Sequence, residues 1–373
     1  MLECRAVSSR GELDEWIALT DRIYADTPQF IPPLLQQLRD FHARKAPYFR
    51  YGSIELLSIV RDGEVVARTT AHTNSKLDAK LGASHLLFGF TEFVDDDEVF
   101  SALAGELETR ARGMGAARLF GAVNLLPNQS GGVVTSGYEE RAFVDGPYTH
   151  AYYPAMYERH GFARRFEGET FVLPGLDRLA KPVEKLVSFD DSRLERERLE
   201  VRRANRRRMK HELAFVREML NASFAQLGYY TEIDEDELAY QVAGLGFLLD
   251  ERIALYLFKD GRPIAFILCI PDISEFVRKV NGDLGLLNQL RLLATRRRYR
   301  SEAICVIQGT IPEEQGKGYL ALLMRELLRN LREGGYHTLR GTFIEHQNVA
   351  SSRYADRIGR PLHGVTFYVR DVE

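Results

Sequence analysis

The stretch ICVIQGTIPEEQGKGYLALLMRELLRNLREGGY, residues 304–336, decides the fold class of this chain. It opens with β-branched and apolar residues, which predict a strand that ends at Ile311-Pro312. A glycine-containing turn over 313–318 leads directly into a helix over 318–333, because apolar residues return there at helical spacing. The apolar face of this helix is formed by Leu320, Leu323, Leu327, Leu328 and Leu331. A strand joined to a helix by a short turn predicts an α/β fold.

The turn itself has the chemistry of an anion site. The first backbone N–H groups of a helix have no partner within the helix and carry the positive end of its dipole. Gly316 and Gly318 have no Cβ, so a phosphate can approach these N–H groups, and Lys317 adds a cation. The spacing differs from the P-loop pattern GxxxxGK[ST] and from a GxGxxG nucleotide loop. The turn therefore predicts either a phosphate site of another kind or a plain strand-to-helix connection.

One order of elements occurs twice along the chain. RIALYLFKDGRPIAFILCIPD places two β-rich runs around Asp260-Gly261, and IELLSIVRDGEVVARTTAH does the same around Asp62-Gly63. Helices are predicted over 8–24 and 97–112 in the first half from their caps and apolar periodicity. The sequence therefore predicts two copies of one α/β unit.

The predicted domain boundaries follow from this repeat. The first domain covers 1–175 and the second covers 213–373, with a charged linker or bridging helix over 176–212. Within this linker, residues 192–212 hold eight arginines and four glutamates, which is typical of a solvated helix. A patch for anionic ligands, such as RNA or the phosphates of CoA, is the alternative interpretation.

Composition narrows the class of protein. The chain has 373 residues, 45% hydrophobic and 28% charged, with a net charge of −3, so it is globular and is not a general nucleic-acid coat. No apolar run approaches the ~18 residues of a membrane span, and no signal peptide is expected. Cys269 and Cys305 lie in apolar runs and are expected to be buried thiols. We therefore expect a cytoplasmic protein with no metal site and no membrane partner.

The turn and its surroundings resemble a known family, the GNAT acyltransferases. Gln315 to Tyr319 is similar to the (Q/R)xxGx(G/A) pyrophosphate loop of that family, and Asn348 with Gly359 resembles its next motif. The resemblance implies two tandem GNAT-like domains, each a mixed central sheet flanked by helices, and acetyl-CoA or another acyl-CoA as the acyl donor. It places at this cofactor Thr310, Ile311, Gln315, Gly316, Lys317, Gly318, Tyr319, Leu320 and Asn348.

The first half resembles the same family through its late helix. YYPAMYERHGF, residues 152–162, is similar to the Tyr-Glu-x-x-Gly-Phe motif, which puts Tyr157 at the position of a general acid. The first half has no Gln/Arg-Gly loop, and its corresponding region is taken to be NLLPNQSGG, residues 124–132. FIPPL, FGFTEF, RGMGAARLFGAVN, IPDISE and IPEEQGKGY further resemble a poorly characterised group of bacterial tandem-GNAT proteins.

Acyl transfer to an amine requires a base for the amine and an acid for the leaving thiolate. Glu345 ends the predicted strand RGTFIE and is our candidate base, with Asp272 and Glu275 of PDISE as alternatives. Asp272 is equally interpreted as a helix cap. The candidate acids are Tyr157 and Tyr354. In the second half Ala355 holds the usual tyrosine position, so Tyr354 is expected to point about 100° away on the helix.

The sequence thus predicts an acyl-CoA-dependent N-acyltransferase that acts on a small-molecule amine. One alternative is a peptide-bond-forming enzyme of the Fem type, for which 192–212 and Arg296 to Arg298 with Arg300 would bind the aminoacyl-tRNA. The other is a catalytically degenerate acyl-CoA-binding protein.

Overall fold

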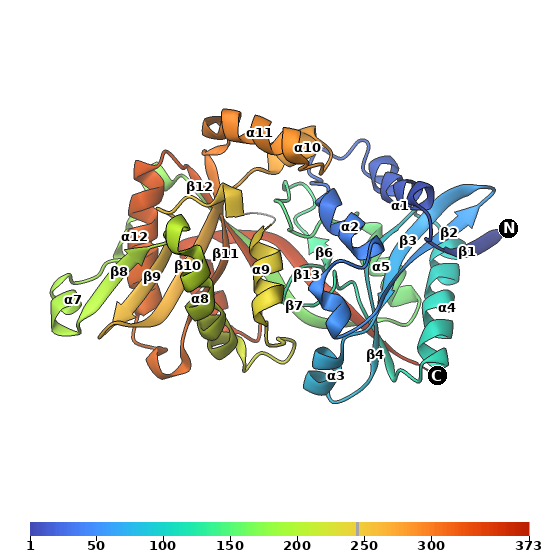
Figure 1. The fold of residues 1–373 in the computed structure, drawn as a ribbon, viewed down its shortest axis with the longest axis horizontal. Helices are drawn as coiled ribbons and strands as arrows, with labels where there is room; N and C mark the ends of the chain where they lie inside the picture. Colours follow the sequence, from blue (N-terminus) through green and yellow to red (C-terminus); the bar gives the residue numbers. More distant parts are fainter. Residues whose placement is uncertain (244–245, 373) are drawn as a thin grey trace.

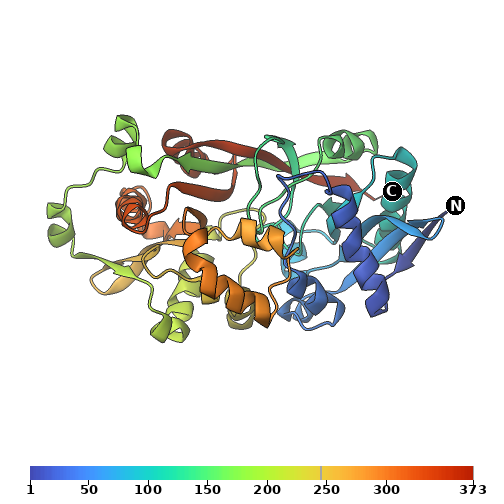
Figure 2. The ribbon, with the colours of Figure 1, turned by 90° about the horizontal axis from the view of Figure 1, so that it is seen from above.

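The computed structural model describes residues 1–243 and 246–372. These residues form one 13-stranded mixed sheet in the order β1-β2-β3-β4-β5-β13-β7-β12-β11-β10-β9-β8, with β6 paired to β13. Helices cover both faces of this sheet (Figures 1 and 2). Within the described residues, no helix combines the length and the apolar character that crossing a membrane requires.

The strands are β1 (Leu2–Ala6), β2 (Ile54–Arg61), β3 (Glu64–His72), β4 (His85–Phe93), β5 (Arg118–Gly121), β6 (Val133–Ser136), β7 (Ala163–Pro174), β8 (Leu199–Arg203), β9 (Ala254–Lys259), β10 (Arg262–Pro271), β11 (Glu302–Thr310), β12 (Thr338–Glu345) and β13 (Arg360–Asp371). The α-helices are α1 (Arg10–Ile23), α2 (Leu35–His42), α3 (Ser75–Leu81), α4 (Asp97–Gly113), α5 (Tyr152–Arg159), α6 (Lys181–Leu186), α7 (Ser192–Arg196), α8 (Met209–Phe224), α9 (Glu235–Ala243), α10 (Ser274–Lys279), α11 (Leu286–Thr295), α12 (Tyr319–Glu333) and α13 (Val349–Ile358).

The repeat predicted from the sequence is present. The β2–β3 hairpin turns at Asp62-Gly63 and the β9–β10 hairpin at Asp260-Gly261, and all four residues have positive φ, as a tight hairpin turn requires. Each half then contains a strand, a helix and a parallel strand, β4–α4–β5 and β11–α12–β12. The predicted tandem α/β architecture is therefore confirmed.

The two halves exchange their last strands. β7, from the first half of the sequence, pairs with β12 of the second half. β13, the last strand of the chain, pairs with β5 of the first half and with β7. The predicted second domain, 213–373, therefore contributes a strand to the first half of the sheet. Backbone pairing between exchanged strands joins the halves through the middle of one sheet.

The single charged helix predicted over 192–212 is wrong. The chain forms α7, then the edge strand β8, and only then begins α8 at Met209. Leu199 packs into the core while Glu200 and Arg202 pair with each other on the outside. Charged side chains are common on edge strands because they prevent pairing with another sheet. The many charges of this segment therefore led to the prediction of a solvated helix where the chain forms an edge strand.

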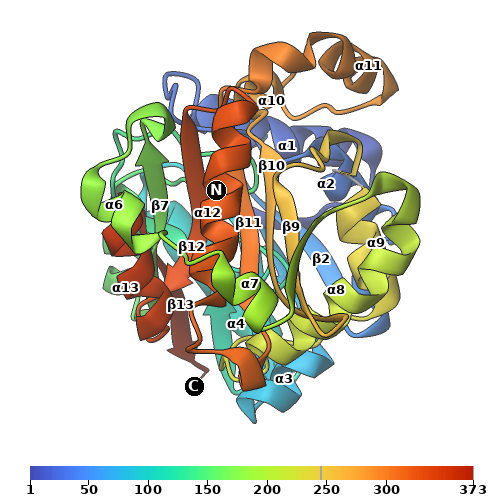
Figure 3. The same cartoon turned by 90° about the vertical axis from the view of Figure 1, so that its left-hand side faces the viewer.

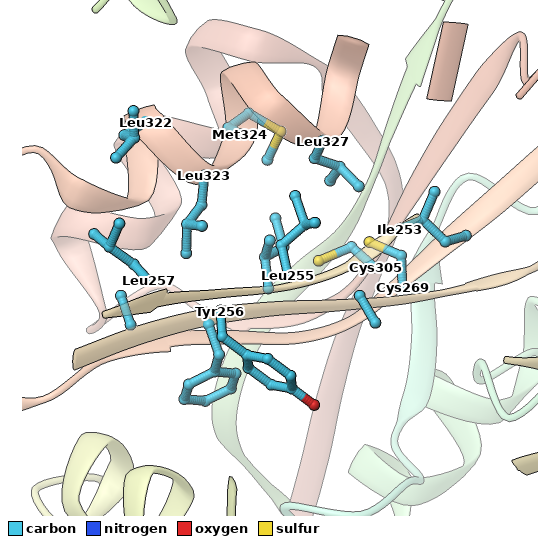
Figure 4. Close-up of a cluster of buried hydrophobic side chains, with 14 of the residues drawn as sticks. Ile253, Leu255, Tyr256, Leu257, Cys269, Cys305, Leu322, Leu323, Met324 and Leu327 are labelled. Carbon is cyan, nitrogen blue, oxygen red and sulfur yellow. The ribbon is translucent and has the colours of Figure 1, made fainter. Parts of the chain in front are cut away.

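The largest core cluster lies between α12 and the strands of the second half (Figure 4). Leu323 and Leu327 of α12 face Leu255 of β9 beside the two cysteines of β10 and β11. Cys269 and Cys305 are opposite each other in the sheet and are buried free thiols, as the sequence predicted. This packing fixes α12, and with it the turn that precedes α12, against the sheet.

A buried ion network also connects the halves. Arg141 of the first half donates to Asp272 Oδ2 at 2.9 Å and to Glu302 Oε2 at 2.7 Å. Arg340 Nε lies 2.8 Å from Glu302 and 3.5 Å from Asp272, whose side chain is almost fully buried. Removing one member of such a network leaves the others buried without full compensation.

We expect Asp272→Asn to lower the free energy of unfolding by about 3–5 kcal/mol, because it leaves Arg141 and Arg340 short of one buried anion. Urea denaturation measures the change. Asp371→Asn is the matched control, since Asp371 is exposed and pairs only with Arg118 among the described residues. If both variants lose equally little stability, the network does not hold the halves together.

Candidate functional site

The turn before α12 presents bare backbone amides. Gly316 and Gly318 have φ of 76° and 79°, a conformation that favours glycine, and Gly318 is the N-cap without a side-chain cap bond. Within the described part of the chain, the backbone N–H groups of residues 316–320 have no hydrogen-bond acceptor. Because α12 has fifteen residues, its dipole adds to the attraction of this end for an anion.

Side chains fix the shape of this turn and place cations beside it. Gln315 Nε2 donates to the carbonyl of Thr310 at 3.0 Å, which closes the turn across its base. Glu314 lies 2.8 Å from Lys317 Nζ and 3.2 Å from Lys259 Nζ, and these two ammonium groups lower the pKa of its carboxyl. Glu314 thus holds two lysines at the start of α12.

A basic hollow of about 630 Å³ opens next to this turn. Its lining is Arg193, Arg196, Glu197, Arg198, Lys259, Asp260, Lys317 and Tyr319. Tyr319 Oη donates to Glu197 at 2.8 Å, and Arg193 binds the same carboxylate at 2.6 Å. Arg193 also donates to the carbonyl of Lys317, so α7 is tied to the turn. Arg193, Arg196 and Arg198 therefore line a hollow beside the turn. They belong to the segment 192–212, for which the alternative interpretation from the sequence was a patch for anionic ligands.

The strands next to the turn diverge. β11 and β12 pair in parallel from Glu302 and Thr338 to Cys305 and Gly341, and the pairing stops there although both strands continue. Thr342 Oγ1 donates to the carbonyl of Val306 at 2.9 Å, just beyond the last pair. Backbone groups beyond this point are released from the β11–β12 ladder, so the opening can accept a ligand between the strands.

Several polar atoms around this opening are buried without a partner among the described residues. They are Ser223 Oγ of α8, Gln308 Oε1 of β11, Glu345 Oε1 of β12 and Tyr354 Oη of α13. Ser223 lies over Gly309, since its Cβ is 3.0 Å from the position that a Cβ on Gly309 would take. Buried polar groups are nearly always satisfied in folded proteins, so a cluster of unsatisfied ones marks a site for a ligand or water.

Glu345 closes the far end of the opening. Its residue is only 4% exposed, and desolvation raises the pKa of its carboxyl, while Arg165 and His346 oppose that rise. Tyr229 is a neighbour of Glu345. Burial raises the pKa of the Tyr229 hydroxyl, and the Glu345 carboxylate raises it further. A desolvated carboxylate with a raised pKa is a stronger base than an exposed one, which suits it to accept a proton.

Tyr354 of α13 is half-buried, and its hydroxyl is a buried atom without a partner among the described residues. α13 begins after Asn348, whose side chain accepts from the N–H of Ser351, so Asn348 caps the helix that carries Tyr354. Burial raises the pKa of the Tyr354 phenol, and the thiol of Cys305 contributes to the same shift. Ala355, at the family's tyrosine position, is also buried. The phenol of Tyr354, one residue before Ala355, therefore lies near Cys305 of β11.

Two other candidates lie elsewhere. Asp272 follows β10 and its backbone N–H donates to the carbonyl of Glu302, so it lies at the beginning of β11 and not at the turn after it. Its carboxylate is held by Arg141, Arg340 and Ser274. Tyr157 is 1% exposed in an aromatic core, stacked on Tyr368 with ring centroids 4.6 Å apart.

The first half has an acidic counterpart of the turn. Because β4–α4–β5 matches β11–α12–β12, the counterpart is the connection over 94–96, and the sequence assignment to 124–132, which follows β5, is wrong. Asp96 caps α4 by accepting from the N–H groups of Glu98 and Val99, and Asp97 follows it. At the start of α4 the carboxylate of Asp96 occupies the first backbone N–H groups, and the negative charge there repels an anion. At the start of α12 the corresponding N–H groups are free to bind an anion.

Comparison with known proteins agrees with this architecture. No protein-family model matches the chain. Protein YghO of Escherichia coli (strain K12) is 25% identical over 365 residues, covering 95% of this chain and 91% of the relative. Bacterial ceramide synthase of Caulobacter vibrioides (strain NA1000 / CB15N) is 23% identical over 376 residues, covering 95% and 93%.

Among solved structures, a tandem GNAT protein from the clavulanic acid biosynthesis pathway superposes with a TM-score of 0.61 at 14% identity. The match covers 100% of this chain and 99% of that one. The chain therefore has the tandem GNAT fold, as the resemblance of its loop implied.

The raised pKa of Glu345 has a consequence for stability. In the unfolded chain the carboxyl titrates at its ordinary 4.5, whereas in the folded protein its pKa is higher, so ionisation at neutral pH costs folding energy. We expect Glu345→Gln to be more stable than the parent at neutral pH, measured by urea denaturation. The advantage should shrink as the pH falls through the raised pKa and vanish below 4.5, where both states carry the proton.

Glu218→Gln is the control, because Glu218 is exposed on α8. Its stability relative to the parent should not vary in this way with pH. A Glu345→Gln variant that is less stable than the parent at neutral pH contradicts the assignment of Glu345 as a desolvated carboxylate.

Proposed function

We propose that this protein is an acyl-CoA-dependent N-acyltransferase that acts on a small-molecule amine, with the reaction in the second half of the chain. The observation that carries the proposal is that the free amides before α12 and the opening between β11 and β12 form one continuous site. Free amides at 316–320 lead into the diverging strands β11 and β12, where unsatisfied polar atoms are gathered. Acyl-CoA supplies the acyl group to this site as a thioester.

The chain offers a separate place for each part of the donor. The amides at the start of α12 would hold the diphosphate, as helix N-termini hold phosphate groups in general. The hollow lined by Arg193, Arg196, Arg198, Lys259 and Lys317 has the charge to bind a further phosphate group. The opening between β11 and β12 would accept the apolar arm and bring the thioester to Gln308 and its neighbours.

Two groups would move protons. Glu345 Oε1 would accept a proton from the amine, for which its desolvated carboxylate and raised pKa are suited. The hydroxyl of Tyr354, buried without an acceptor among the described residues, would donate a proton to the departing sulfur. A phenol with a raised pKa remains protonated at neutral pH, which this role requires.

The relatives support an amine acceptor. One relative, matched over 93% of its length, is named a bacterial ceramide synthase, and a ceramide is the amide of a fatty acid with a long-chain amino alcohol. The acidic start of α4 supports a reaction confined to the second half, because Asp96 and Asp97 would repel a diphosphate in the first.

The two alternative functions, a Fem-type enzyme and a degenerate acyl-CoA-binding protein, stay predictions, and each would give a different experimental result. An aminoacyl-tRNA-dependent enzyme would transfer an amino acid from charged tRNA and would bind tRNA with a strong dependence on salt. A degenerate protein would bind acyl-CoA but release no free CoA with any amine.

We expect Gly318→Asp to weaken binding of acetyl-CoA at least about tenfold, because it puts a carboxylate and a strained positive φ where the diphosphate would lie. Isothermal titration calorimetry measures the affinity. Gly335→Asp is the matched control, since Gly335 lies just after the other end of α12, has φ of 80° and has equally open surroundings.

Equal binding by the parent and both variants would place the diphosphate elsewhere. No binding by the parent, tested with acetyl-CoA and with long-chain acyl-CoA, would contradict the proposed donor.

We expect Tyr354→Phe to lower kcat roughly 100-fold or more with little change in KM, because the phenol would act on the leaving sulfur and not on binding. Release of free CoA thiol with an amine library measures the rate. Tyr157→Phe should leave the rate unchanged, because Tyr157 lies in the aromatic core of the first half. Loss of activity in Tyr157→Phe alone would move the reaction to that half.

A further inference from the structure

Helix α11 exposes a continuous apolar face. Leu286, Leu287, Leu290 and Leu293 are 72%, 77%, 55% and 38% exposed. At 100° per residue these four side chains fall within one stripe of α11. They are half of the large apolar side chains that the described residues expose, and the other four, Met1, Met114, Val306 and Val349, are far apart in the sequence. An apolar face of this kind marks a surface that contacts something.

The opposite side of α11 contacts the core through one buried residue. Leu292 is 1% exposed and belongs to a core cluster with Phe276 of α10 and Tyr299. The same cluster contains Tyr24 and Phe143 of the first half, so α11 lies over the junction between the halves. Figure 3 shows α10 and α11 at one end of the molecule, outside the sheet. The four leucines therefore point away from the side of α11 that contacts the core.

Arginines border this face. Arg291 lies on α11, and Arg296, Arg297 and Arg298 follow the helix, all of them exposed. Within residues 1–243 and 246–372, no acidic side chain forms an ion pair with any of these four. By contrast, Arg300 next to them lies 3.9 Å from Asp250. Three consecutive unneutralised arginines beside exposed leucines are complementary to a surface that is both apolar and anionic.

We propose that α11 and Arg296 to Arg298 dock this protein on an anionic lipid surface. A helix with leucines on one face and arginines at its border lies in the plane of the interface, with its apolar side chains among the acyl chains and its cations at the headgroups. Such a helix does not need the length of a membrane span, so the expectation of no membrane partner, which rested on that length, does not apply to it.

The fold gives this docking a definite orientation. α11 precedes β11 and the glycine turn follows it, so nine residues of strand separate the two, about 30 Å. Figure 3 shows α11 at one end of the molecule and α7, which borders the turn, toward the other. Docking through α11 would therefore leave the turn before α12 open to water.

Other occupants fit less well. One face of a ten-residue helix is small beside the roughly 800 Å² that each partner buries in a stable protein complex. A nucleic acid would use the arginines but would gain nothing from Leu286, Leu287 and Leu290, which are the most exposed of the leucines. An anionic lipid surface uses both the leucines and the arginines and does not require a large contact area.

The test is flotation of the full-length protein with vesicles of phosphatidylcholine, with and without phosphatidylglycerol. We expect binding only when phosphatidylglycerol is present. Arg296→Gln combined with Arg297→Gln should weaken it roughly 30-fold. Leu287→Glu combined with Leu290→Glu should abolish binding, because ionised carboxylates do not enter the acyl chains. Met114→Glu, which changes an exposed apolar residue far from α11 in the sequence, should bind like the parent.

Each outcome decides the proposal. Because all four substituted side chains point outward, thermal unfolding should show that the variants are folded. Vesicle binding that the leucine variant retains would overturn the proposal. Binding of tRNA that depends on the arginines but not on the leucines would assign the patch to nucleic acid. A parent that is dimeric without lipid, and becomes monomeric on Leu287→Glu, would assign it to a second copy. Acetyl-CoA binding by the variants should be unchanged, which separates this proposal from the proposed function.

Discussion

The parallel pairing of β11 with β12 stops after Cys305 and Gly341, and the candidate site depends on this interruption. Up to that point the backbone N–H and carbonyl groups of the two strands bond to each other, and beyond it the two backbones no longer pair. The glycine turn before α12 begins where β11 ends, so the unsatisfied opening and the free helix amides are joined without a gap. Packing of α12 on β9 and β10 holds both in place.

The same α/β unit has two electrostatic forms in this chain. In the first half Asp96 supplies a helix with a carboxylate cap, which satisfies its first amides and gives it a negative charge. In the second half Gly318 leaves the amides of α12 bare and Glu314 holds two lysines beside them. The two halves thus share one architecture, while the helix caps differ in their attraction for an anion.

The exchange of β7 and β13 makes the halves depend on each other. Glu345 at the end of β12 is paired in register with Gly168 of β7, so a strand of the first half borders the candidate base of the second. Arg141 and Arg340 meet around Asp272 and Glu302 at the opposite end of the strands. A strand of the first half therefore borders the candidate site of the second half, and the two halves share one continuous sheet.

The sequence by itself determined the repeated α/β unit, its two Asp-Gly hairpins, the glycine turn before α12 and the buried cysteines. These features follow from short-range causes, namely side-chain periodicity, positive φ and helix caps. Only the tertiary structure decided the exchange of last strands, the burial of edge strand β8 residue Leu199 among charged neighbours, and the positions of the two tyrosines, with the Tyr354 hydroxyl buried on α13 and Tyr157 buried in the aromatic core of the first half. Strand partners and buried contacts join residues far apart in the chain, and local propensity carries no information about which of them meet.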